Sequence, residues 1–215
     1  MDGGLLVALY CTALALRLVP LVLSPLPYNI DGFPLARIAD DIGSTGAWRI
    51  DETDINSYNQ KMPAYSLLWA AYAGIAGLHP LVHVQMAMAA VTSLVVLPAY
   101  LIGLKLTGHR GVALASGLFV ASFGSFLFLT SAIMKESVGL LVLPVLLLLF
   151  HERRDPRKRA LALLLLLVLP LLHHLTTLVA LGSVATLLVL DHRRAGRVVG
   201  RRAERPRREA VRVRV

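Results

Sequence analysis

Charged residues are scarce in this sequence. Only 16% of its 215 residues are Asp, Glu, Lys or Arg, and 56% are hydrophobic. Water-soluble domains usually contain about 25% charged and about 45–50% apolar residues. The few charges are clustered, so uncharged stretches about 20 residues long recur, and this length matches the roughly 30 Å hydrocarbon core of a bilayer. The composition therefore excludes an ordinary soluble domain and predicts an all-α, polytopic transmembrane bundle.

Cysteine and acidic residues are also few. The single cysteine, Cys11, excludes a disulfide framework within one chain and leaves the redox compartment open. The 13 acidic and 22 basic residues give a net charge of +9, which on its own would suit a nucleic-acid binder. Ten arginines, however, fall within 193–214, and basic segments beside membrane helices mark the cytoplasmic side and contact anionic lipid. We therefore expect 191–215 to be a disordered cytoplasmic tail, with lipid and not nucleic acid as its partner.

The apolar stretches predict about six membrane spans and no internal repeat. The first stretch lacks a basic n-region and a small-residue cleavage site, and it contains Arg17, so we interpret it as a retained helix and not a signal peptide. The predicted membrane domain is 1–190. Its spans are 4–24, 81–104, 111–130, 138–150, 160–172 and 176–190.

A long external loop, 25–80, separates the first two spans. It is net acidic over 28–62, which disfavours the cytoplasmic side. We expect two surface helices in it, at about 33–43 and 63–79. The second is rich in aromatic residues, which favour the headgroup region, so it is predicted to be interfacial or partly embedded. The alternative is that 63–79 spans the membrane and breaks the charge rule. The aromatic residues concerned are Tyr65, Trp69 and Tyr72.

Basic turns orient the bundle. Lys105 with Arg110 forms one turn, 151–159 forms another, and the arginine tail is the third. Positive residues in short loops favour the cytoplasm, which places both termini there in a multi-pass protein of the cell membrane. The run from Ala160 to Leu190 is then a hairpin, interrupted near Pro170. As a consequence, the external face gathers the ionisable residues Asp31, Lys135, Glu136, His173 and His174.

Several stretches resemble the polyprenyl-phosphate-dependent glycosyltransferases of the GT-C fold, such as protein O-mannosyltransferases, aminoarabinose transferases and the catalytic subunit of oligosaccharyltransferase. They are LRLVPL in the first helix, YNIDGFPLARIADD in the external loop, QKMPAYSLLWAAYAG after it, and the region around TSAIMKESVG. The resemblance covers about residues 5–155. Family members commonly have more helices and a soluble domain, so the chain corresponds to their N-terminal module.

The resemblance implies an inverting sugar transfer from a polyprenyl-phosphate donor at the external face. Asp31 matches the acidic residue of the family's first external loop, and Glu136 the acid of the second. Such a reaction needs a carboxylate to take the acceptor's proton and positive charge to stabilise the departing phosphate. Asp31 is then the base or a metal ligand, and Asp31 and Glu136 could share a Mg²⁺ or Mn²⁺ ion. The expected phosphate-binding residues are Lys135, Arg37 and Lys61.

Each of these residues also has a simpler interpretation. Asp31 could cap the following helix, and Lys135 with Glu136 could be an exposed loop pair that contributes little. His173 and His174 are possible metal ligands, but adjacent side chains on a helix point about 100° apart, so this requires a helix break at HHLTT. Arg17 should face the bundle and pair with Asp31 or another acid, or else extend to the membrane surface.

Two other functions remain open. The chain could be a non-catalytic membrane subunit or lipid-carrier-binding protein, completed as a transferase by a second membrane polypeptide. A transporter is disfavoured because the ionisable residues cluster at one face and not at the midplane, where transport sites lie.

Overall fold

The computed structural model describes residues 3–24, 26–55 and 57–192. All regular secondary structure in these ranges is helical, which confirms the predicted all-α class. The chain divides into two compact units, Met1–Thr177 and Leu178–Val215. Most of the predicted basic tail, from residue 193 onward, lies outside the described residues.

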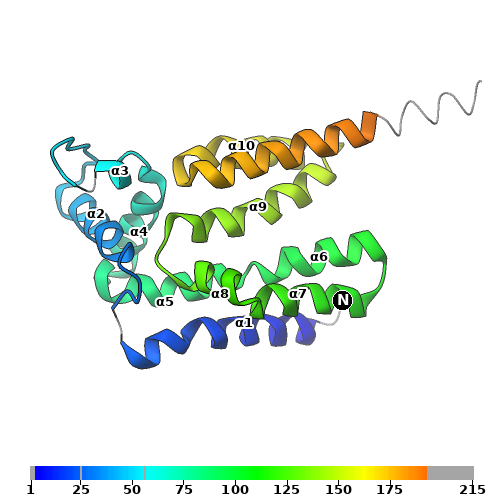
Figure 1. Cartoon of the computed structure of the whole chain (residues 1–215), viewed down its shortest axis with the longest axis horizontal. Coiled ribbons are helices and arrows are strands. Elements are labelled where there is room, and N and C mark those ends of the chain that lie inside the picture. Colours follow the sequence, from blue (N-terminus) through cyan, green and yellow to red (C-terminus); the bar gives the residue numbers. More distant parts are fainter. Residues whose placement is uncertain (1–2, 25, 56, 193–215) are drawn as a thin grey trace, which may run out of the picture. The chain divides into compact units, whose positions relative to one another are not determined.

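The helices of the first unit follow one another with short connections, except for the segments 24–31 between α1 and α2 and 46–56 between α2 and α3 (Figure 1). They are α1 (Gly3–Leu23), α2 (Gly32–Thr45), α3 (Ser57–Gln60), α4 (Pro63–Ala76), α5 (Pro80–Ser93), α6 (Val96–Thr107), α7 (Arg110–Ser122), α8 (Gly124–Ser131), α9 (Lys135–His151) and α10 (Pro156–Leu172). A further helix, His174–His192, begins in the first unit and supplies the described part of the second.

The helix boundaries follow proline and glycine in the sequence. α2 and α4 end at Gly46 and Gly77, whose left-handed backbone (φ 68° and 66°) lets their N–H groups bond back to the last turn. Proline suits the first helical position because its missing N–H would have no intrahelical partner there. Three helices begin in this way, at Pro63, Pro80 and Pro156. The surface helices predicted at 33–43 and 63–79 correspond to α2 and α4.

Three helices of the described chain are long and apolar enough to cross a membrane: Gly3–Leu23, Pro80–Thr107 and His174–His192. α7 and α8 together also meet the length and hydropathy that a span requires, but they are bent by 62° at Phe123, which is typical of a broken span or a re-entrant loop. The predicted spans 138–150 and 160–172 correspond to α9 and α10, which have 17 residues each. A straight span needs about 20. The six-span count is therefore not established, and the structure supports the coarser conclusion that apolar membrane-length helices are present.

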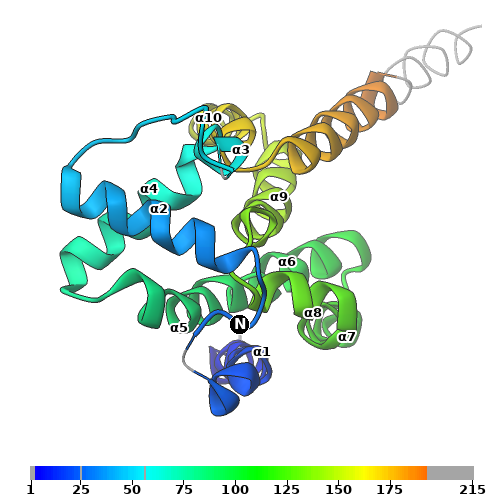
Figure 2. The same cartoon turned by 60° about the vertical axis from the view of Figure 1, so that its left-hand side comes forward.

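The core of the first unit consists of two clusters. One is formed by α1, α6 and α7 around Val96 and Ala113, and the other by α2, α4, α5 and α9 around Trp69 and Met88. α2 packs across α4 and α5 (Figure 2), and its apolar face covers the rings of α4. As a result Tyr65 is 0% and Trp69 2% exposed. These two rings therefore pack inside the protein and do not face lipid headgroups, while the interfacial or partly embedded position of 63–79 stays a prediction.

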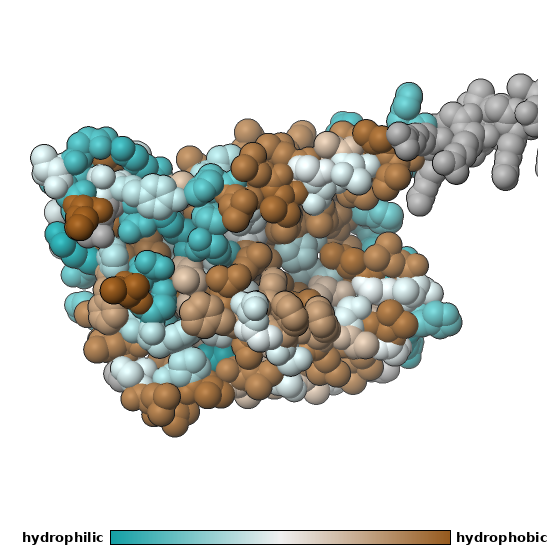
Figure 3. All heavy atoms as spheres, in the orientation of Figure 1, coloured by the Kyte–Doolittle hydropathy of each residue, from teal (hydrophilic) through white to brown (hydrophobic). Residues whose placement is uncertain are grey.

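The surface of the first unit is apolar along its helices and polar at one end. Hydrophilic side chains gather over α2, α3 and the loop between them, whereas hydrophobic side chains cover much of the flanks of the helices (Figure 3). Single exposed leucines on a protein are ordinary, but long rows of them suit a lipid-facing surface. The exposed apolar residues include Val19, Val22 and Leu23 of α1, Phe119, Phe123 and Phe128 of α7–α8, and Leu163, Leu164, Leu167 and Leu171 of α10.

Candidate functional site

The turn between α8 and α9 carries the candidate site and is held by side chains from other elements. A helix leaves its last four carbonyls without intrahelical partners, and such groups are tolerated at membrane depth only where protein or water satisfies them. The donors and acceptors are Tyr28 Oη to Phe128 O (2.9 Å), Ser137 Oγ to Leu129 O (2.7 Å) and Ala132 O (2.8 Å), Thr92 Oγ1 to Thr130 O (2.5 Å), Gln85 Nε2 to Ser131 O, and Asn29 Nδ2 to Ile133 O (3.3 Å). This bonding fixes the point at which α9 begins.

Arg17 also contacts this helix end. Its side chain is fully buried, and Nε and Nη2 donate to Thr130 Oγ1 at 3.1 and 2.8 Å, while Nη1 donates to Ala13 O at 3.1 Å. The prediction that Arg17 faces the bundle is confirmed, but its expected pairing with Asp31 or another acid is wrong. Arg17 instead contacts the C-terminal end of α8, where aligned peptide dipoles give partial negative charge that stabilises the guanidinium.

A cavity of about 220 Å³ lies beside this turn. The start of α2, the short helix α3 and the start of α9 contribute its walls, so it joins three segments that are far apart in the sequence. The lining residues are Asp31, Leu35, Tyr58, Asn59, Met134, Lys135 and Glu136. The structure thus brings together three of the predicted site residues, the two acids and one lysine.

Lys135 is the most unusual residue of this cavity. Its side chain belongs to a residue only 7% exposed, and its Nζ atom has no hydrogen-bond partner. Nζ lies 3.8 Å from the centre of the Tyr58 ring, a cation–π contact. Burial lowers the pKa of Lys135, and the nearby charges of Glu136 and Asp31 oppose this effect. A buried charge without hydrogen bonds is costly, so Lys135 is a cation that an anionic ligand would stabilise.

Glu136 does not pair with its neighbour Lys135 but with His173. Glu136 Oε1 lies 3.0 Å from His173 Nε2. Residues adjacent on a helix do not face each other, which explains why the lysine remains unpaired. Burial lowers the pKa of His173, and the Glu136 charge opposes that shift. His173 follows the last residue of α10, so this pair joins two residues that are 37 positions apart in the sequence.

The predicted break at HHLTT is confirmed. α10 ends at Leu172, His173 is extended, and a new helix begins at His174. The two imidazole rings are 5.0 Å apart and tilted by 51°, and His174 Nδ1 lies 3.4 Å from the Tyr58 hydroxyl. In the described part of the chain, however, no three His, Cys, Asp or Glu side chains are arranged to hold a metal ion. The predicted ligand set of Asp31, Glu136, His173 and His174 is therefore not assembled as a group.

Two predicted phosphate-binding residues lie elsewhere. Lys61 Nζ is 3.0 Å from Glu52 Oε2, and Arg37 Nε is 3.8 Å from Asp41 Oδ2, both on the exposed surface. Neither Lys61 nor Arg37 lines the Lys135 cavity. The reason is helical geometry: Arg37 is six residues after Asp31, which places the two side chains on different faces of α2.

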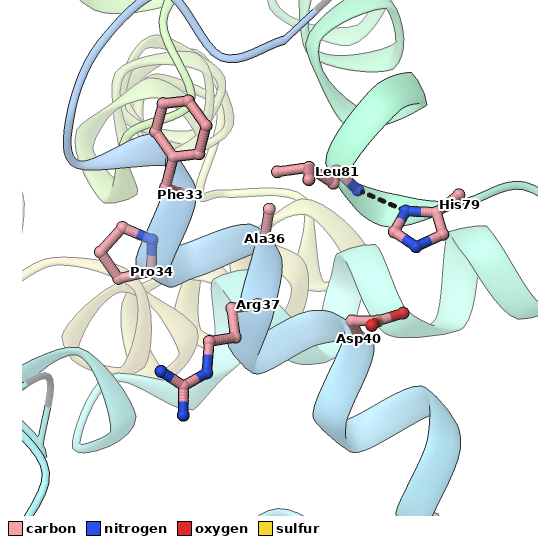
Figure 4. A pocket seen from close by; sticks show the side chains of 7 residues that line it. All are labelled: Phe33, Pro34, Ala36, Arg37, Asp40, His79 and Leu81. Carbon is pink, nitrogen blue, oxygen red and sulfur yellow. Dashed lines mark hydrogen bonds between the residues drawn. The ribbon is translucent and has the colours of Figure 1, made fainter.

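Arg37 instead borders a larger cavity of about 460 Å³ between α2 and the start of α5 (Figure 4). There the Leu81 backbone N–H donates to His79 Nδ1 at 3.2 Å. The lining is mostly apolar, with polar groups at Arg37, Asp40 and His79.

Asp31 sits at the N-cap position of α2, as the simpler interpretation requires, but its side chain makes no capping hydrogen bond. Its carboxylate is exposed at the cavity. Sequence reasoning missed Tyr58 and Asn59 of α3. Their only signal is an aromatic residue shortly before the proline that starts α4, which does not show that the loop folds back onto α9.

No family model matches the chain, and no curated protein and no solved structure is significantly similar to it. The resemblance to GT-C transferases therefore rests on the sequence stretches quoted above.

Proposed function

We propose that this chain is a membrane protein that binds a polyprenyl-phosphate sugar in the Lys135 cavity and transfers the sugar to an acceptor at the external face. The observation that carries the proposal is the buried ammonium of Lys135, which has no hydrogen-bond partner and shares its cavity with two carboxylates. A phosphate oxygen would supply the missing acceptor, and the apolar surface of the helices would accommodate the lipid chain. The proposal includes a GT-C-like multi-pass fold with both termini in the cytoplasm.

The chemistry divides between the cation and the acids. The acceptor hydroxyl attacks the anomeric carbon, its proton passes to a carboxylate, and the carbon–oxygen bond to the phosphate breaks, so the lipid phosphate leaves with the bonding electrons. Lys135 would stabilise the charge that develops on this phosphate. Asp31 is the better candidate for the base because its carboxylate is exposed and makes no capping bond, whereas Glu136 is held by His173.

A divalent ion fits this arrangement in one way. Mg²⁺ is usually held by one or two carboxylates together with substrate phosphate. Asp31 and Glu136 are the residues that would hold Mg²⁺ or Mn²⁺, with the donor phosphate completing the set. The ion would neutralise phosphate charge alongside Lys135.

The test is binding of a short-chain polyprenyl phosphate, with and without its sugar, to the purified full chain in detergent, in the presence and absence of Mn²⁺. We expect Lys135→Met to weaken binding by at least about tenfold, which corresponds to 1.4 kcal/mol. Lys61→Met is the matched control, because Lys61 is an exposed lysine of the external loop that pairs with Glu52. Inorganic phosphate is titrated in parallel, and equal affinity for it would show a phosphate site without lipid recognition. Equal binding by wild type and Lys135→Met would overturn the proposal.

The second candidate is a lipid-carrier-binding subunit without its own transfer activity. This function is favoured because, of the three basic residues expected to bind phosphate, Lys135 lines the cavity whereas Arg37 and Lys61 lie elsewhere. Binding without sugar transfer by the chain alone, and transfer after addition of a second membrane polypeptide, would select this function.

A further inference from the structure

His173 lies at the break between α10 and the helix His174–His192, where its backbone is extended (φ −162°, ψ 124°). Its Nδ1 atom accepts a hydrogen bond from the Thr176 backbone N–H at 3.4 Å and lies 3.0 Å from the Thr176 hydroxyl. Because Nδ1 accepts a hydrogen bond from the backbone N–H, the neutral imidazole carries its own proton on Nε2. The start of the new helix thus selects the tautomer of this ring.

The Nε2–H group of His173 lies beside the carboxylate of Glu136. The distance from His173 Nε2 to Glu136 Oε1 is 3.0 Å, and the His173 side chain is 7% exposed while that of Glu136 is 33% exposed. A partly exposed glutamate in the first turn of a helix has several rotamers available. A buried donor from a fixed ring selects one of them and leaves Oε2 as the oxygen free for substrate or an ion.

A second contact fixes the spacing between these residues. Gly139 lies three residues after Glu136, and Thr176 lies three residues after His173, which is about one helical turn in each case. A Cβ atom at Gly139 would lie 3.0 Å from Thr176 Oγ1 and 3.2 Å from Thr176 Cγ2. α9 therefore approaches the new helix more closely than a larger residue would allow.

We infer that His173 is a positioning residue for Glu136: its Nδ1 atom is fixed by the following helix, and its Nε2–H holds the carboxylate in one orientation at the cavity. This inference rests on the proposed function, in which Glu136 acts on the donor. It assigns His173 a role through Glu136 and not as a ligand of a metal ion.

Substitution of His173 with asparagine or glutamine tests the contacts of Nδ1 and Nε2 separately. In His173→Asn the amide can still cap the helix, since Asn is a favoured N-cap, but it cannot reach Glu136. We expect kcat to fall by about 100-fold, the scale of a 1 Å misplacement, with donor affinity unchanged. In His173→Gln the longer amide can donate to Glu136 and should recover at least part of the loss. The double variant His173→Asn/Glu136→Gln should be no slower than Glu136→Gln alone.

A purely structural role predicts other results. If His173→Asn turned over at the wild-type rate, or if His173→Gln were as slow as His173→Asn, the inference would be overturned. So would additive losses in the double variant.

The pairing has a readout that does not depend on transfer. In nitrogen NMR of the wild-type chain, His173 should show a protonated Nε2 and an unprotonated Nδ1, and Glu136→Ala should shift the Nε2 resonance. Absence of transfer with this signature present would count against the proposed function. A protonated Nδ1 in the neutral ring, or no response to Glu136→Ala, would reject the positioning role itself.

Discussion

The Lys135 ammonium lies 3.8 Å from the centre of the Tyr58 ring, and no hydrogen-bond acceptor reaches it. The two residues come from α9 and α3, so the contact holds the segment that carries α3 against the start of α9. An aromatic face stabilises a cation without supplying an oxygen that would compete with a ligand. The arrangement keeps a positive charge in place and leaves its three N–H donors available.

Tyr58→Leu should weaken phosphate binding because it removes this contact. A cation–π interaction at a partly exposed site contributes about 0.5–1 kcal/mol, so we expect a two- to fivefold lower affinity for polyprenyl phosphate at pH 7. Tyr58→Phe keeps the ring and should bind like wild type. Fluorescence or calorimetric titration measures both variants. Equal weakening by Leu and Phe would mean that the hydroxyl, which lies near His174, matters instead of the ring.

The lowered pKa of Lys135 predicts a specific pH dependence. A lysine with a lowered pKa in the folded state takes up a proton on unfolding in the interval between that pKa and its ordinary value of 10.5. Stability should therefore rise as the pH rises through this interval. Phosphate affinity should fall over the same interval, because the anion needs the protonated amine.

Lys135→Met should remove both trends and raise stability at pH 7, by about 1 kcal/mol or 2–4 °C in Tm, since it replaces a buried charge with an apolar side chain. Thermal unfolding in detergent between pH 7 and 10 measures this. If wild type and Lys135→Met had the same pH slope, the lysine would not be the titrating group.

Thr130→Val should destabilise the first unit strongly. Valine has nearly the same shape, but it removes the hydroxyl that accepts from Nε and Nη2 of Arg17. The bond from Nη1 to Ala13 O would remain, and removing the partner of a buried charge costs about 3–5 kcal/mol. In Thr130→Val/Arg17→Met the charge is gone as well, so part of the stability should return. Ser122→Ala, which removes an exposed hydroxyl bonded within α7, is the control and should be near neutral. Strict additivity of the two substitutions would show that the contact does not contribute.

The sequence predicted the elements of this fold better than their arrangement. The long apolar helices, the surface helices at α2 and α4, and the break at HHLTT follow from local composition and from proline and glycine. The burial of Tyr65 and Trp69 could not be predicted, because it depends on α2 folding back over α4. The partner of Arg17 was missed for a similar reason: it is a threonine hydroxyl at a helix end, and sequence reasoning searched for an acid.

The candidate site was predicted in part. Asp31, Lys135 and Glu136 were expected on one face from the charge distribution of the turns, and the structure places them around one cavity. The expected phosphate ligands Arg37 and Lys61 do not line this cavity, and each pairs with an acid close in sequence. Such local pairs can be foreseen from spacing at i and i+4, as for Arg37 and Asp41, but the 3.0 Å contact of Glu136 with His173 requires the tertiary fold.

Glu152 should give the protein an acid-sensitive contact at the other end of α9. It pairs with Lys105 and Lys158, and their hydrogen bonds lower the pKa of Glu152 to about 2. A lowered carboxyl pKa stabilises the folded state above the ordinary value of 4.5, and this stabilisation is lost as the pH falls toward 2. Glu152→Gln should lower Tm at pH 7 and flatten the loss of stability between pH 5 and 2. The difference from wild type should shrink in 1 M salt; a difference that persisted in salt would point to packing and not to charge.

Gly139→Ala should destabilise the contact between α9 and the helix that begins at His174. Alanine normally favours a helix over glycine by about 0.5–1 kcal/mol. At Gly139, however, the new methyl group would lie 3.0 Å from Thr176 Oγ1, so Thr176 must move, and overpacking of this kind costs about 1–3 kcal/mol. Gly182→Ala is the matched control, because a Cβ atom there meets nothing within 4 Å. We expect Gly182→Ala to raise Tm slightly and Gly139→Ala to lower it.

The movement of Thr176 should also disturb His173 Nδ1, so Gly139→Ala should slow sugar transfer. The double variant Gly139→Ala/Thr176→Ser removes the crowded methyl group and should recover part of both losses. A rise in Tm for Gly139→Ala equal to that of the control would show that the two helices are not in close contact at this position.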